Sequence, residues 1–165
     1  MEKRAAPLRS NVAPMLKRIS HTFIHVLDQD EALDFYVEKL GMVVHTDADL
    51  GVMRFLTVNL PDQPDVELVL MLPGPPAFDD ATAAQIRELV AKGGAGGGVI
   101  FETDDCQGTY ERLLAAGVEF TQEPTERFYG TDCALRDPFG NPIRFTQPPD
   151  GPIVVPSVEA LQTQR

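Results

Sequence analysis

The sequence has 165 residues, a length that suits one compact domain or two small halves sharing a core and excludes a larger multidomain architecture. Apolar residues make up 43% and charged residues 24% of the chain, as in an ordinary globular protein. With 14 basic and 25 acidic residues, the net charge of -11 repels phosphate backbones and anionic lipids. We therefore expect neither nucleic acid nor a membrane as a partner.

The two ends of the chain and its two cysteines favour a cytoplasmic location for the protein. Residues 1–16 are basic but contain no apolar run, so they do not predict a secretory signal, and no stretch approaches the roughly 18 apolar residues that span a membrane. Cys106 and Cys133 predict reduced, half-buried thiols and no disulfide. We expect a cytoplasmic protein with a flexible leader over residues 1–16 and a proline-rich tail over residues 148–165.

The first half of the chain, about residues 17–72, predicts a strand, a helix and three further strands. Residues 19–26 alternate as a strand, the acidic run 28–30 supplies a helix N-cap, and Gly41 ends the helix as a left-handed C-cap. Apolar residues at positions 33, 36, 37 and 40 share one helical face. The further strands are expected over residues 42–45, 53–58 and 66–72.

The second half, about residues 98–147, repeats this pattern with an offset of 76 or 77 residues. A strand over 99–103 leads to a helix capped by Asp104 or Asp105 and ended by Gly117, and strands follow over 118–122, 131–136 and 143–146. The connector 73–97 carries its own helix, capped by Asp79 or Asp80. Its glycine run, 93–98, enters a strand without a Lys-Ser/Thr pair, so it does not predict a phosphate-binding loop.

Three stretches together are typical of one known family. They are HTFIHV at 21–26 with Asp28, ALDFY and LGM after it; VELVL at 66–70; and RDPFGNPIRF at 136–145, with an Asp-Pro-x-Gly-Asn turn before a final strand. In these motifs the chain, from about residue 17 to 147, resembles the vicinal oxygen chelate superfamily, which includes glyoxalase I, bleomycin-resistance proteins and extradiol dioxygenases.

The resemblance implies an α+β fold in which two βαβββ modules form a curved mixed sheet around a cup, within a single domain spanning 17–147. In metal-dependent members, the first and last strands of each module supply ligands, and His21 and Glu67 match those of the first module. The second-module positions fall on Gly98, or Gly97 if the register slips, and on Arg144, which have no metal-donor atom to offer. We expect no complete metal site and no cofactor; if a divalent ion binds, His21 and Glu67 are its ligands.

Strand alternation predicts which side chains face the cup. His21, Phe23 and His25 share one face of the first strand, Glu67 lies on the same face of a neighbouring strand, and Glu102 shares a face with Gly98 and Ile100. Mixed apolar and ionisable residues of this kind are typical of a small-molecule pocket. In relatives that use glutathione, the resemblance implies an arginine at the position of His25, where it holds the thiol cofactor. A histidine at this position weighs against glutathione as a substrate here.

Arg144 has three interpretations. Its guanidinium pairs with Glu67 in the space of the metal, grips an anionic or carbonyl group of a ligand, or lies solvated at the rim. His21 either contacts a metal or ligand or is a hydrogen-bonded, half-buried imidazole.

The remaining polar candidates are weighed in the same way. Glu102 either acts as a general base or is a solvated carboxylate, and Tyr129 either closes over a ligand as a lid or packs within its loop. His45 is expected at the surface.

Three functions are compatible with these residues. The first is a binding protein, without a complete metal site, that encloses a planar or aromatic small molecule and contacts it through His21, Phe23, His25, Glu67, Tyr129 and Arg144. The alternative is a metal-dependent glyoxalase-like lyase or isomerase, or a dioxygenase, that uses His21 and Glu67. The third is an accessory protein whose cups bind nothing. A homodimer is expected, because edge strands of single cups need cover.

Overall fold

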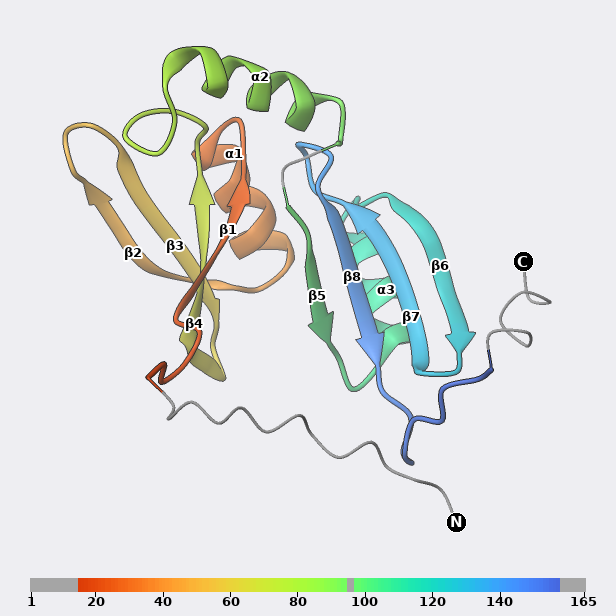
Figure 1. Ribbon diagram of the computed structural model, residues 1–165. Helices are drawn as coiled ribbons and strands as arrows, with labels where there is room; N and C mark the ends of the chain where they lie inside the picture. Colours follow the sequence, from red (N-terminus) through yellow and green to blue (C-terminus); the bar gives the residue numbers. More distant parts are fainter. Residues whose placement is uncertain (1–14, 95–96, 158–165) are drawn as a thin grey trace.

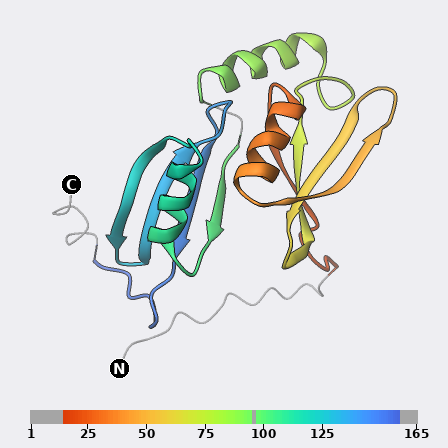
Figure 2. The same ribbon diagram turned by 180° about the vertical axis from the view of Figure 1, so that it is seen from behind.

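The computed structural model describes residues 15–94 and 97–157. Figure 1 shows two four-stranded sheets side by side, joined by a helical connector, and Figure 2 shows a helix against the rear of each sheet. This is the α+β arrangement of two βαβββ modules that the sequence predicts. Residues 1–14 and 158–165, most of the expected leader and part of the expected tail, lie outside the described residues, as do 95 and 96 of the glycine run.

The first module consists of β1 (His21–His25), α1 (Gln29–Leu33), its π-helical continuation η1 (Asp34–Lys39), β2 (Val43–Asp49), β3 (Arg54–Leu60) and β4 (Gln63–Met71). The strand order is β1-β4-β3-β2, with β1 parallel to β4 and the other pairs antiparallel. The Asp28 carboxylate accepts hydrogen bonds from the backbone N–H groups of Asp30 and Glu31, which starts the helix. Strand β2 extends beyond its expected end at residue 45.

The second module repeats this plan with β5 (Val99–Glu102), α3 (Cys106–Ala115), β6 (Phe120–Arg127), β7 (Gly130–Arg136) and β8 (Pro142–Gln147) in the order β5-β8-β7-β6. The N-cap that the sequence left open is Asp105, whose side chain accepts a hydrogen bond from the Gly108 N–H. Gly41 and Gly117, which end the two equivalent helices, both have φ of 76°, so the internal repeat extends to the backbone conformation of the caps.

The connector forms α2 (Asp80–Ala91), which lies along one end of both modules in Figure 1. Its N-cap is Asp79, whose side chain accepts from the Thr82 N–H. Val90 of this helix is fully buried in the core, which anchors the connector. No helix in the described part of the chain is long and apolar enough to cross a membrane.

A buried carboxylate joins the two modules. Tyr36 of the first module donates its hydroxyl proton to Asp137, in the turn before β8, over 2.9 Å. The Asn141 side chain donates to the same carboxylate over 2.7 Å and to the backbone carbonyl of His25 over 2.9 Å. Burial, and then the charge of Asp137, raise the pKa of Tyr36, so the phenol stays protonated and remains a donor.

Replacing Tyr36 with phenylalanine should lower the free energy of unfolding by about 1.5–3 kcal/mol, because a buried carboxylate loses one of its donors. Urea denaturation of the two proteins measures the difference. An unchanged unfolding free energy would show that this hydrogen bond does not hold the modules together.

The two thiols are free and fully buried, deeper than the half-buried state expected from the sequence. Burial, followed by the neighbouring Cys106 thiol, raises the pKa of Cys133 to about 12. Because the thiolate is the reactive form, Cys133 should react with Ellman's reagent at pH 8 far more slowly in the folded protein than in guanidinium chloride. Peptide mass spectrometry after brief labelling locates the modified thiol, and rapid labelling of Cys133 in the folded protein would contradict the expectation.

Candidate functional site

Each sheet has one face covered by its helix and one open face. In β1, Ile24 is fully buried under the helix, whereas Phe23 on the opposite face is 53% exposed. In β5, Ile100 is 72% exposed. The expected facing of His21, Phe23 and His25 away from the helix is therefore confirmed.

The two open faces do not meet within one chain. In both views α1 lies between the first sheet and the second module (Figures 1 and 2), and its continuation η1 supplies the Tyr36 hydroxyl that reaches Asp137. The open face of the first sheet is the opposite one, so it points away from the second module. The position of α1 therefore argues against pairing of these two open faces within one chain.

The open face of the first module carries a polar cluster around Glu67. Its carboxylate oxygens lie 3.4 Å from His21 Nε2 and 3.1 Å from His45 Nδ1, and Thr57 donates its hydroxyl proton to one of them over 2.6 Å. His21 and Glu67 are neighbours because β1 and β4 pair in parallel register at these two residues. His45, expected simply at the surface, is half-exposed and contacts Glu67.

No pattern in the sequence predicts the contact between His45 and Glu67. Val44 pairs with Val58 and Thr46 with Thr57, so His45 is the extra residue of a β-bulge. A bulge redirects side chains at a point that strand alternation cannot foresee.

His21, His45 and Glu67 are all residue types that can bind a metal ion. Within the described residues, no group of three or more His, Cys, Asp or Glu side chains is arranged to hold one. Instead, the carboxylate of Glu67 is engaged by Thr57 and lies directly against both imidazoles. The arrangement is that of a hydrogen-bonded polar group with little space between its members.

The open face of the second module is organised by Asp132, whose side chain is 0% exposed. Arg144 forms an ion pair with this carboxylate, and Arg127 Nε lies 3.6 Å from it. The Gln122 amide donates to it over 3.0 Å and the Tyr129 hydroxyl over 3.3 Å. Two half-exposed guanidinium groups, Arg127 and Arg144, thus flank one buried carboxylate on this face.

Of the three interpretations of Arg144, its pairing with Glu67 is wrong. Arg144 pairs with Asp132 because β7 and β8 are adjacent: Ala134 lies opposite Arg144, and Asp132 lies two residues along the same face. The Arg144 side chain remains 40% exposed and lines a hollow of about 480 Å³ together with Gly98, Ile100, Thr121 and Ala134. The Arg144 side chain is thus fixed by Asp132 of its own module.

Gly98 stands where the resemblance implies a chelating side chain. A Cβ atom at this position would lie 3.1 Å from the carbonyl oxygen of Pro142 and 3.2 Å from its ring. Both contacts are tighter than side chains normally make, so β8 would have to move by a few tenths of an ångström to admit a side chain at this position.

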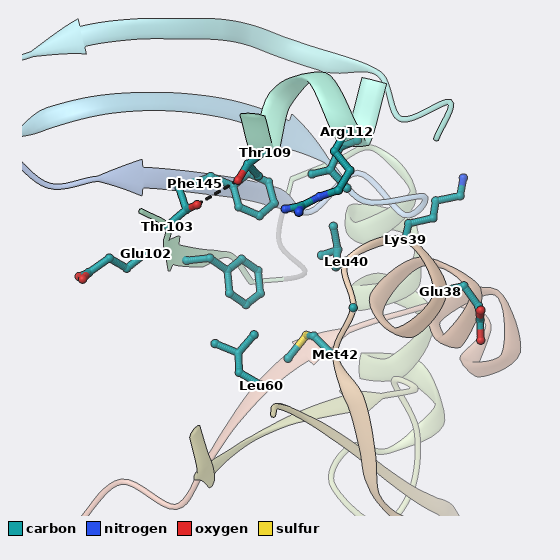
Figure 3. Close-up of a pocket in the computed structure, with 13 residues that line it drawn as sticks. Glu38, Lys39, Leu40, Met42, Leu60, Glu102, Thr103, Thr109, Arg112 and Phe145 are labelled. Atoms are coloured by element: carbon teal, nitrogen blue, oxygen red, sulfur yellow. Dashed lines mark hydrogen bonds between the residues drawn. The ribbon is translucent and has the colours of Figure 1, made fainter. Parts of the chain in front are cut away.

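The remaining candidates occupy three different surroundings. The His25 ring lies 5.6 Å from that of Phe78, in the connector. Tyr129 lies in the loop before β7, as expected, with its hydroxyl on Asp132. Glu102 is exposed, and its carboxylate points away from the cavity between the modules in Figure 3.

A family model described as the Glyoxalase/Bleomycin resistance protein/Dioxygenase superfamily matches residues 18–145. The chain belongs to this superfamily. YurT from Bacillus subtilis (strain 168) is 35% identical over 130 residues, which cover 79% of this chain and 98% of YurT.

Two solved structures of this superfamily's fold are also similar. UcmS2 is 46% identical, with a TM-score of 0.72, over 80% of this chain and 98% of its own. TnmS3, an antibiotic binding protein from Streptomyces sp. CB03234, is 27% identical, with a TM-score of 0.67, over 83% of this chain and all of its own.

Between the two superfamily modules, on the side of α1 and α3, lies a cavity of about 400 Å³ (Figure 3). Of the residues that line this cavity, strand alternation assigns only Glu102 to the cup. No pattern in the sequence predicts the cavity itself. Its lining comes from the end of η1, from β5 and from α3, elements that are brought together only when the modules dock.

Replacing Asp132 with asparagine should lower the free energy of unfolding by about 3 kcal/mol, because two guanidinium groups lose the buried charge that they share. The guanidinium groups are partly exposed, so the loss should lie at the lower end of the range for buried ion pairs. Chemical denaturation measures the effect. Asp104→Asn, which removes the same charge from an exposed position, is the matched control and should change stability by less than about 0.5 kcal/mol. Equal effects of the two substitutions would contradict a structural role for Asp132.

Proposed function

We propose that this chain is a small-molecule-binding protein that encloses a planar, partly aromatic guest between the open face of one module and the open face of the other module in a second copy. The observation that carries the proposal is the ion-paired cluster of Arg144 and Asp132, which occupies the open face where metal-dependent relatives would place ligands. A fixed guanidinium can donate hydrogen bonds to a carbonyl or anionic oxygen of a guest. It has no lone pair with which to bind a metal ion.

The apolar part of the guest would lie on exposed side chains next to these polar groups. Phe23 and Ile100 lie on the open faces of β1 and β5, and His21, His25, Glu67 and Tyr129 complete our set of ligand contacts. Apolar surface with a few fixed polar groups is the usual composition of a small-molecule site. The similarity to TnmS3, an antibiotic binding protein, supports binding without turnover.

We infer that two copies assemble, so that the first module of one faces the second module of the other. Support comes from α1, which turns the open face of the first sheet away from its own second module. In the described residues β1 and β5 each pair with a single neighbour, so each sheet has an uncovered edge. The free, buried cysteines suit a cytoplasmic location for such a dimer.

The test uses 9-fluorenone, a planar ketone, and fluorene, the same ring system without the carbonyl. Fluorenone should bind about tenfold more tightly than fluorene, because Arg144 donates to its oxygen, and Arg144→Gln should remove this preference. Ile100→Glu should weaken both ligands, whereas Leu89→Glu, an exposed apolar residue of α2, should weaken neither. Titration calorimetry measures each affinity, and sedimentation analysis gives the oligomeric state.

Failure of fluorenone to bind, or equal binding to the Ile100 and Leu89 variants, would contradict the proposal. A metal-dependent lyase, isomerase or dioxygenase is the competing function, and metal analysis of the purified protein separates the two. A stoichiometric divalent ion that is lost in Glu67→Ala would favour the enzyme. Absence of bound metal, with thermal stability unchanged by a chelator, would favour the binding protein.

A further inference from the structure

We propose that the cavity between the modules is a second ligand site, separate from the open faces, and that it binds an apolar carboxylate through Arg112. The cavity has a volume of about 400 Å³, within the range of small-molecule pockets. It lies on the side of α1 and α3, so a molecule bound there would not occupy the proposed cup.

The apolar part of the cavity lining comes from both modules. Phe101 and Phe145 form a stacked pair, with ring centroids 5.7 Å apart and an interplanar angle of 19°. In Figure 3, Met42 and Leu60 lie below the Phe145 ring and Leu40 lies beside it. An alkyl chain or a single aromatic ring can contact both modules here at once.

A neighbouring cavity of about 310 Å³ extends this apolar surface toward the edges of β1 and β5. It shares Met42, Leu60, Phe101 and Glu102 with the first cavity and adds Leu68, Val99 and Ile100, the last of which also lies on the open face of β5. The space between the modules is therefore longer than one ring, and it suits an elongated apolar group.

The charge of the cavity determines which end group it accepts. In Figure 3 the Arg112 guanidinium points toward the middle of the lining residues, whereas the charged ends of Glu38, Lys39 and Glu102 point away. In the described part of the chain, no hydrogen bond or ion pair engages the Arg112 side chain.

Arg112 is exposed at the rim of the cavity, so its guanidinium is accessible to a ligand from solution. A guanidinium group beside apolar walls is complementary to a carboxylate, which it can bind through two parallel hydrogen bonds. A monocarboxylate with an apolar tail matches both the charge and the walls.

The probes are 4-phenylbutanoate and its uncharged amide, 4-phenylbutanamide, titrated into the full chain by calorimetry. The acid should bind at least about tenfold more tightly than the amide. Arg112→Gln should abolish this preference, while Lys39→Gln, which removes an equal charge at the same rim, should retain it. Leu60→Trp should weaken both probes by filling the cavity.

Two results would overturn the proposal: no binding of the acid to the wild-type chain, or equal affinity of the acid for the wild-type and Arg112→Gln proteins. In NMR spectra, the acid should shift the amide signals of Gly41 and Thr109, which line the cavity, and shifts confined to β7 would also count against it. The outcome is independent of the proposed function, because Arg144→Gln should leave phenylbutanoate binding unchanged and Arg112→Gln should leave fluorenone binding unchanged.

Discussion

The hydrogen bonds that converge on Asp137 determine how the two modules face each other. This carboxylate receives the Tyr36 hydroxyl from one module and the Asn141 amide from its own turn, while Asn141 also reaches the backbone of β1. Backbone N–H groups of Phe139 and Asn141 donate to its second oxygen, so the charge is satisfied although it is buried. The position of α1 between the modules, and with it the direction of both open faces, depends on this connection.

The two open faces carry different polar clusters. The first is centred on a carboxylate, Glu67, between two imidazoles; the second is centred on Asp132, whose single charge is exceeded by its two guanidinium partners. A duplicated fold has thus acquired two different chemical surfaces. If such faces oppose each other in a dimer, attraction between the guanidinium groups of one and the carboxylate of the other favours pairing of unlike modules over pairing of like ones.

The sequence predicted features that depend on local patterns. The module order, the helix caps at Asp28 and Gly41 and the facing of β1 follow from periodicity and turn chemistry, which act over a few residues. It failed where the outcome depends on which residues of neighbouring strands lie opposite each other. Asp132 was overlooked as the partner of Arg144, and the bulge at His45 was not foreseen, because cross-strand register is set by the packed sheet.

The tight approach of Pro142 to Gly98 has an evolutionary consequence. A single substitution of Gly98 by histidine would place its Cβ against the carbonyl of the adjacent strand, so the donor could be regained only if β8 moved as well. Arg144 would also have to be replaced, which would leave the buried Asp132 with one cation fewer. Placing metal-binding side chains at both second-module positions therefore requires several coordinated changes, in the backbone of β8 as well as in the side chains around Asp132.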